Sequence, residues 1–154
     1  MTRTKFIADA GKQEIVVMAE FNAPRERVFK AMTDPKLIPQ WWGPKVLTTT
    51  VDMMEPQKGG AWRFVQRDPQ QNEYAFHGVY HEVMAPERMI YTFEYEGAPG
   101  HVLLTDVTLS GLNGHTILTE KSVYLSVEDR DAMLKEGMEG GEDESMERLA
   151  ELVE

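Results

Sequence analysis

The sequence predicts an α+β fold in which a curved antiparallel sheet wraps around a long C-terminal helix, with two short helices after the first strand. Three features carry this prediction. Two helix starts and a tryptophan pair lie together in residues 22–44, six strand-like stretches follow in close succession, and residues 141–152 have helical periodicity. The connections between strands are too short for crossover helices, so the sheet is expected to be antiparallel.

The first predicted strand covers residues 14–21, where one alternating set of side chains is wholly apolar and the other includes Glu14 and Glu20. This alternation places one face of the strand on a core and leaves the other at the surface. Residues 1–12 lack the pattern, and we expect them to be a flexible N-terminus or the start of the same strand. Residues 13–154 are then a single domain, since a chain of 154 residues can bury a substantial core unaided.

Two short helices are predicted from capping and proline chemistry. Pro24 suits the first turn of a helix, and helical periodicity then continues to Met32. Asp34 can cap a second helix, which is expected to stop near Trp41 because Gly43 and the proline after it break helical structure. A pair this short needs a large partner surface on which to bury its aromatic side chains.

The rest of the chain supplies that surface as a series of strands. Each break between them contains Gly, Pro or Asn, the residues that turns require, and Asn113-Gly114 is the clearest hairpin signal. The strands are therefore expected to form a meander that is curved by its own twist. They are predicted at residues 46–53, 61–66, 74–83, 89–96, 102–109 and 116–123.

The C-terminal segment predicts an amphipathic helix over about residues 141–152. Ser126 and Asp129 resemble a capping box at the start of an earlier helical run, which Gly137 and the pair Gly140-Gly141 interrupt. A sheet with an apolar concave face and a long helix across it encloses space, and this enclosed space is the first indication of function. The apolar face of the helix consists of Met146, Leu149, Ala150 and Val153.

Composition excludes several classes of function. The net charge of -10 repels phosphate backbones and anionic lipid surfaces, so no nucleic-acid partner is expected. The absence of cysteine removes disulfides and thiolate chemistry. No apolar run approaches the ~20 residues of a membrane span, and the first residues lack the apolar stretch of a secretion signal, so we expect no membrane insertion and a cytoplasmic location.

Six blocks of sequence occur in order along the chain: EFNAPRERVFKAMTDP, WWGP, PQKGGAWRF, APERMIYTFEY, GHT and GMEGGEDESMERLAELVE. Together they resemble the START-like helix-grip superfamily (SRPBCC), and in particular the family homologous to the C-terminal domain of the activator of heat-shock protein 90 ATPase. The resemblance implies a β-α-α-β6-α helix-grip with a hydrophobic cavity between sheet and long helix. Members of the wider superfamily bind lipids, plant hormones or polyketides, and some are cyclases. The chain departs from the family pattern at Glu142, where an aromatic residue is common.

Aromatic and methionine side chains are the candidate lining of this cavity. Alternation within the predicted strands gathers the aromatic residues on one face, which we place inward. Methionine adapts to different apolar shapes, so the set favours a hydrophobic, amphipathic or lipid-like ligand. The candidate cavity residues are Met32, Trp41, Trp42, Met53, Trp62, Phe64, Phe76, Tyr80, Tyr91, Phe93, Met146 and Leu149.

The titratable residues form no catalytic constellation that the sequence alone defines. His77 and His81 point the same way in a strand but stand ~13 Å apart, too far to share a metal ion, so neither a metal nor a cofactor is expected. Arg63 could bind a ligand carboxylate if it faced inward. Carboxylates within strands are expected to face solvent, and would support acid–base chemistry only as an inward pair: Glu82, Glu94, Asp106 and Glu120.

Three functions follow as alternatives. The first is noncatalytic binding of a small hydrophobic or amphipathic molecule in the cavity. The second is a cyclase- or hydratase-type enzyme that orients a reactive ligand and moves a proton with an inward His or Glu. The third is a chaperone-associated interaction module, which the family resemblance and the acidic C-terminal segment support. A homodimer through exposed apolar surface near Trp41 and Trp42 is also open.

Overall fold

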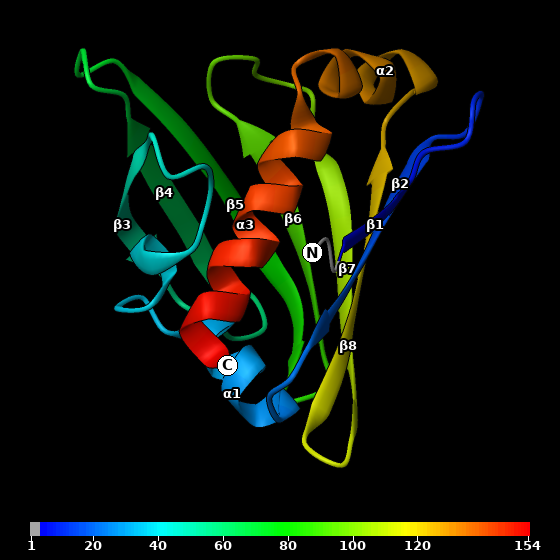
Figure 1. Cartoon of the computed structure of the whole chain (residues 1–154). Helices are drawn as coiled ribbons and strands as arrows, with labels where there is room; N and C mark the ends of the chain where they lie inside the picture. Colours follow the sequence, from blue (N-terminus) through cyan, green and yellow to red (C-terminus); the bar gives the residue numbers. More distant parts are fainter. Residues whose placement is uncertain (1–3) are drawn as a thin grey trace.

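The computed structural model describes residues 4–154 and shows an eight-stranded antiparallel sheet curved around a long helix (Figure 1). Neighbouring strands follow the order β1-β2-β8-β7-β6-β5-β4-β3. The chain therefore leaves the sheet after β2, enters it again at the opposite edge with β3, and comes back beside β2 with β8. The strands are β1 (Thr4–Ile7), β2 (Glu14–Phe21), β3 (Thr48–Met54), β4 (Ala61–Arg67), β5 (Glu73–Met84), β6 (Arg88–Tyr95), β7 (Leu103–Leu112) and β8 (His115–Tyr124).

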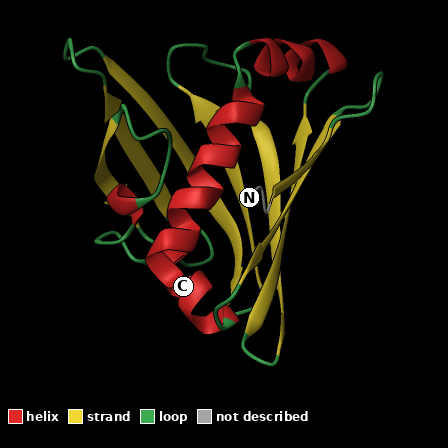
Figure 2. Ribbon diagram, viewed as in Figure 1, coloured by secondary structure: helices red, strands yellow, loops and turns green. Residues whose placement is uncertain are grey.

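The helices lie on the concave side and at the ends of the sheet (Figure 2). α3 crosses the concave face, with α1 near its C-terminal end and α2 near its N-terminal end (Figure 1). No helix within residues 4–154 is long and apolar enough to cross a bilayer. The helical segments described are α1 (Arg25–Thr33), the 3-10 turn η1 (Ile38–Gln40), α2 (Val127–Lys135) and α3 (Met138–Val153).

The first predicted strand is confirmed as β2, with the same bounds. Its alternating apolar residues are buried, and its other face is partly exposed. The residues before it differ from the expectation, because residues 4–7 form β1, a strand of their own that pairs with β2 and places Thr4 opposite Ala19. The remainder of that expectation, on residues 1–3, lies outside the described residues.

The two predicted short helices differ in outcome. α1 is a helix close to its predicted bounds, but the segment after it contains only the 3-10 turn η1. Asp34 is not the N-cap of η1, which is Leu37 and has no side-chain cap; the Oδ1 of Asp34 instead accepts a hydrogen bond from the N–H of Lys36 at 2.9 Å in the turn before η1. Pro39 has no N–H to donate to the carbonyl of Pro35, so an α-helical ladder cannot be completed across this segment.

The C-terminal helical region divides at Gly137. Ser126 caps α2 as predicted, its Oγ accepting a hydrogen bond from the N–H of Asp129 at 3.0 Å. Gly137 then adopts a left-handed conformation with φ of 83°, which ends the run and precedes α3. α3 begins at Met138, earlier than predicted, and therefore contains Gly140 and Gly141 within its first turns.

The main core lies between the C-terminal half of α3, α1 and the concave face of the sheet. The end of α3 is also fastened by polar contacts, because Arg27 donates from Nη1 to the carbonyl of Val153 at 2.9 Å. A smaller core lies beside β2 and β7 under α2. The buried residues that α3 contributes to the main core are Met146, Leu149, Ala150 and Val153.

The substitution Leu149→Ala tests how far the fold depends on the contact between α3 and the sheet. Leu149 is fully buried, and comparable truncations lower the free energy of unfolding by about 2–5 kcal/mol because they leave a void. We expect a loss of this size in urea denaturation, whereas Glu151→Ala, at an exposed position of the same helix, should change the value by less than about 0.5 kcal/mol. Equal effects of the two substitutions would contradict the packing described.

Candidate functional site

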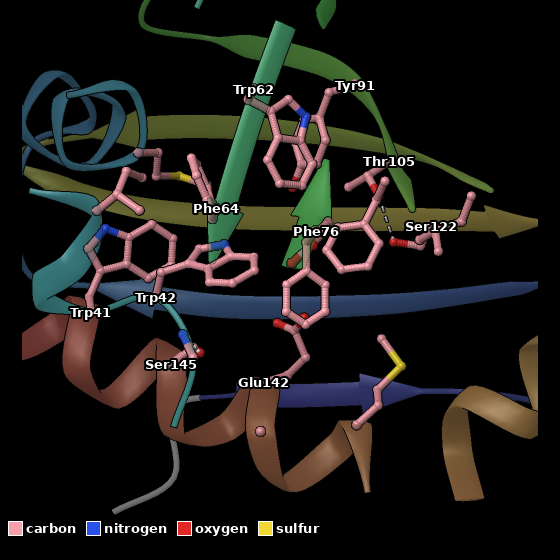
Figure 3. Close-up of a pocket in the computed structure, with 18 of the residues that line it drawn as sticks. Trp41, Trp42, Trp62, Phe64, Phe76, Tyr91, Thr105, Ser122, Glu142 and Ser145 are labelled. Atoms are coloured by element: carbon pink, nitrogen blue, oxygen red, sulfur yellow. Dashed lines mark hydrogen bonds between the residues drawn. The ribbon is translucent and has the colours of Figure 1, made fainter. Parts of the chain in front are cut away.

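A cavity of about 230 Å³ lies between the concave face of the sheet and the N-terminal half of α3 (Figure 3). Strands β4 to β8 form its floor, and the segment around Trp41 and Trp42 closes one side. Met133 of α2 and Met138 at the start of α3 close another side. The cavity therefore occupies the part of the helix–sheet interface that the main core leaves unfilled.

Most of the residues predicted to line a cavity are brought together here. They come from α1, the tryptophan segment, three neighbouring strands and α3, which are distant in sequence. Their role in ligand binding stays a prediction. Those that line the cavity are Met32, Trp41, Trp42, Trp62, Phe64, Phe76, Tyr80, Tyr91, Phe93 and Met146.

Met53 does not line the cavity, and its assignment was wrong. A β-bulge between Val51 and Met53 shifts the alternation of β3 by one residue. Met53 consequently pairs with Arg63 on the outer face and is 47% exposed. Met54 takes the inward position opposite Trp62 and packs against the main core.

Leu149 also differs from the expectation that it lines the cavity. It is part of the solid core beyond the end of the cavity and does not line it.

The tryptophan pair lines the cavity as predicted, but it is less exposed than expected. Trp41 is buried, and its indole Nε1 donates to the carbonyl of Ala31 at 2.9 Å. Trp42 is half-buried and packs on the core. The two tryptophans are thus not an exposed apolar surface, which was the basis for expecting a homodimer.

Trp42 is the centre of an aromatic wall on one side of the cavity. Its ring lies edge-on to three others, with centroid distances of 5.1 Å to Phe64, 5.4 Å to Phe76 and 6.5 Å to Trp62. In edge-to-face pairs of this kind the positive edge of one ring meets the electron-rich face of the other. Figure 3 shows these rings converging on the cavity from β4, β5 and the tryptophan segment.

Trp62 reaches across its neighbour strand because that strand has a glycine opposite it. Trp62 pairs with Gly78, and its Nε1 donates to the carbonyl of Thr92 at 3.2 Å. A Cβ atom on residue 78 would meet that carbonyl oxygen at 1.8 Å and the indole nitrogen at 2.6 Å. Gly78 is therefore required for the indole to lie flat over β5 and reach the backbone of β6.

Polar contacts from α3 hold the tryptophan segment in place. Arg148 donates to the carbonyls of Gly43 at 2.7 Å and Gln40 at 3.1 Å. The N–H of Gly43 in turn donates to Ser145 Oγ at 2.9 Å, and Glu144 accepts from the N–H of Lys45. The side of the cavity that carries Trp42 is thus attached to the same helix that forms the roof.

Two carboxylates, Glu120 and Glu142, lie in this largely apolar lining. Glu120 is on the inward face of β8, between buried Leu118 and Ser122, and Glu142 is on α3. Figure 3 shows Glu142 extending from α3 into the cavity toward the ring of Phe76. Within residues 4–154 neither carboxylate makes an ion pair or a hydrogen bond.

Burial and mutual repulsion change the ionisation of this pair. Burial raises the pKa of Glu142 to about 7. Burial, and then the charge of Glu142, raise the pKa of Glu120 well above its usual value of 4.5. Two such carboxyls titrate as one unit, and near neutral pH the pair retains protons that solvent-exposed carboxylates have lost.

The sequence contained a signal for Glu120 that the solvent-facing expectation overrode. Glu120 has the same parity along the strand as the apolar or small residues Leu118, Ser122 and Tyr124, all of which face inward. The expectation that it faces solvent was therefore wrong. In the sequence, Glu142 stands out only as a departure from the family pattern. Its position in the cavity follows from the orientation of α3.

The other candidate catalytic residues lie outside the cavity. The imidazole of His77 is on the outer face, with Nδ1 2.9 Å from Glu96 Oε2 and Nε2 3.2 Å from Glu94 Oε1. Arg63 pairs with Glu96 at 2.8 Å on the same face and so cannot meet a ligand in the cavity. No group of three or more His, Asp or Glu residues in the described part of the chain could hold a metal ion. Also outside the cavity are His81, Glu82 and Asp106.

The fold and the cavity together define a helix-grip protein, in which a curved antiparallel sheet and a long C-terminal helix enclose a space between them. The family model described as Activator of Hsp90 ATPase homolog 1-like protein matches residues 22–154, so the chain belongs to this family. No functionally curated protein matches the chain.

Solved bacterial structures share the whole architecture. A protein from Rhodobacter sphaeroides has a TM-score of 0.89 at 25% identity, with 97% of each chain covered. One from Arthrobacter aurescens has a TM-score of 0.88 at 26% identity, covering 95% of this chain and 88% of the other. One from Chromobacterium violaceum has a TM-score of 0.83 at 27% identity, covering 92% and 96%. The helix-grip prediction is therefore confirmed.

The substitution Glu142→Gln tests the ionisation of the carboxylate pair. Between pH 4.5 and about 7 the folded protein holds a proton at Glu142 that the unfolded chain has released, so raising the pH favours unfolding. Each tenfold difference in proton affinity corresponds to about 1.4 kcal/mol. We expect the free energy of unfolding of Glu142→Gln, relative to wild type, to increase as the pH rises through this range.

The matched control for this measurement is Glu139→Gln, one turn earlier on α3 and exposed. Its side chain lies in solvent and outside the cavity, so this variant reports any effect of the substitution that does not involve the cavity. Parallel pH profiles for Glu142→Gln and wild type would show that Glu142 is not held in the cavity as described.

Proposed function

We propose that this protein binds a small hydrophobic or amphipathic molecule in the cavity between the sheet and α3. The observation that carries the proposal is the cavity itself, which is lined by aromatic and methionine side chains from four strands, three helices and the segment around Trp41 and Trp42. A dry void of this volume would lower stability by something on the order of 5 kcal/mol, comparable to the whole stability of many domains. A ligand or water is therefore expected to occupy it.

The volume limits the ligand. Drug-sized ligands use pockets of ~300–1,000 Å³, and an engineered apolar cavity of ~150 Å³ holds benzene. At about 230 Å³ the cavity suits one or two fused rings or a short alkyl chain rather than a two-chain lipid. The methionines Met32, Met133, Met138 and Met146 around its edge allow it to adapt to different shapes.

A second candidate function is acid–base catalysis on a bound ligand, of the cyclase or hydratase type. Glu120 favours it, because a carboxyl with a raised pKa in an apolar cavity can hold and return a proton near neutral pH. If a substrate were found, Glu120→Gln would abolish turnover without preventing binding. A chaperone partner remains a prediction from the family alone.

Native mass spectrometry of freshly purified protein tests the binding proposal directly. We expect a mass excess of a few hundred daltons at most, because the cavity volume admits no larger molecule. The excess should disappear on denaturation, and organic extraction should recover the same molecule. A bare polypeptide mass, together with no binding of small neutral aromatic probes, would contradict the proposal.

A cavity-filling substitution gives a second test. Gly141 lines the cavity, and a Cβ atom there meets no other atom within 4 Å, so Gly141→Leu fills space without distorting the helix. Gly140→Leu is the matched control, since its Cβ position is also open but does not line the cavity. Both replacements should stabilise α3 by up to about 1 kcal/mol.

Only Gly141→Leu should weaken binding of the neutral two-ring fluorophore 2-naphthol, by at least about tenfold, as measured by fluorescence titration. Both replacements raise the helix propensity of α3 and should stabilise it equally. A loss of binding in only one variant therefore results from the filled cavity and not from unfolding. Equal binding by the two variants would place the fluorophore outside the cavity.

A further inference from the structure

We propose that the cavity selects amphipathic molecules that carry a cationic nitrogen, with Glu120 and Glu142 as the counter-charge. The inference rests on the proposed binding function and adds the charge of the ligand to it. It follows from the sign of the charges in the lining, from the lack of partners for the two carboxylates, and from the aromatic faces beside them.

The formal charges in the lining are all negative. Among the described residues that line the cavity there is no lysine, arginine or histidine, and Glu120 and Glu142 are the acidic ones. The field of the whole chain, with a net charge of -10, has the same sign. A fatty acid or another carboxylate finds no cation in this lining, whereas an ammonium group would be attracted toward the cavity before contact.

The two carboxylates reach the same cavity from opposite sides. Glu120 approaches from β8 on the floor of the cavity and Glu142 from α3 on its roof, and within residues 4–154 neither has a polar partner. A buried carboxylate without a partner is unfavourable, and a cation that binds beside it removes that penalty. On the outer face, by contrast, Glu96 is paired with both Arg63 and His77.

The surrounding rings suit an organic cation. Trp42, Trp62, Phe76 and Tyr91 line the same cavity, and each of these rings has an electron-rich face. A cation over such a face gains additional attraction. The cavity is a poor binding site for a hard metal ion, because Ca²⁺ takes about six to eight oxygen ligands and the lining is mainly carbon.

A buried hydroxyl pair beside Glu120 adds hydrogen-bonding capacity. Thr105 and Ser122 are opposite each other on β7 and β8, with their oxygen atoms 3.1 Å apart (Figure 3). One hydroxyl donates to the other, and the proton of the second has no acceptor within the described residues. The pair can therefore donate to or accept from a small polar head group that lies next to Glu120.

Binding of a cation should be linked to proton release. A cation favours the ionised form of the pair, so its affinity should rise with pH until both carboxyls are ionised. The other titratable groups that face the pair are Tyr80, Tyr91 and Tyr124, and burial raises the pKa of each, so they stay neutral throughout. The pH dependence would thus report Glu120 and Glu142.

Three probes with one hydrocarbon body test the inference: 4-phenylbutylamine, 4-phenylbutan-1-ol and 4-phenylbutyrate. Isothermal titration calorimetry with the full chain at pH 7.5 gives each affinity. We expect the amine to bind at least about tenfold more tightly than the alcohol, which corresponds to about 1.4 kcal/mol, and the carboxylate to bind more weakly than the alcohol. For the amine alone, affinity should fall as the pH is lowered to 5.5.

The outcomes separate this inference from the proposed function. Equal binding of all three probes, or tightest binding of the carboxylate, would overturn the charge preference while leaving apolar binding in the cavity intact. Failure of all three probes to bind would overturn both. An amine preference that does not change with pH would place the cation away from the carboxylate pair and also overturn the inference.

The variant Glu120→Gln/Glu142→Gln locates the effect. It should retain the affinity of the alcohol and lose the preference for the amine, whereas Glu139→Gln, exposed on the same helix, should behave as wild type. Retained alcohol binding shows that the double variant is folded. If its folding fails, each single variant should still reduce the amine preference, and an unchanged preference in both would contradict the assignment.

Discussion

One face of α3 packs against the concave side of the sheet through Leu149, Ala150 and Val153, and the position of every cavity residue depends on this contact. The composition of the helix changes along its length. Its C-terminal half carries the large apolar residues that fill the interface, whereas its N-terminal half presents Gly141 and Glu142, which leave it open. The core and the cavity are therefore two ends of one interface, and the helix sequence decides where the first gives way to the second.

The charged residues of the strands differ between the two faces of the sheet. On the outer face, side chains such as Arg88 and Asp106 form ion pairs that are partly exposed and contribute little net stability. Glu96 shows the electrostatic effect of such pairing, since hydrogen bonds from Arg63 and then His77 lower its pKa to about 2. On the inner face the pKa values of the two carboxylates are raised instead, because no cation among residues 4–154 offsets their burial. A site that tolerates this arrangement sacrifices stability, as sites shaped for a ligand often do.

Much of the fold could be predicted because each strand has one buried and one exposed face, so alternation reports both the strand and its orientation. β2 is the clearest case. β1 was missed because a four-residue edge strand has a single neighbour and little burial to leave a pattern. Met53 was misplaced because a bulge inverts alternation without a local sequence signal. The inward position of Glu120 was present in the pattern, but the facing of Glu142 depends on how α3 lies across the sheet, which is a nonlocal property.

The glycines at the start of α3 have a kinetic consequence. Each glycine inside a helix weakens it by about 1 kcal/mol relative to alanine. Gly140 and Gly141 also have no side chain that could pack the N-terminal end of α3 against the sheet. The opposite end is anchored by Leu149 and by the hydrogen bond from Arg27. In terms of hydrogen exchange, amides near Gly141 are expected to open by local fraying and those near Leu149 only by global unfolding. If the cavity binds a ligand as proposed, fraying of this end of α3 gives that ligand a route of exchange that does not require the whole fold to open.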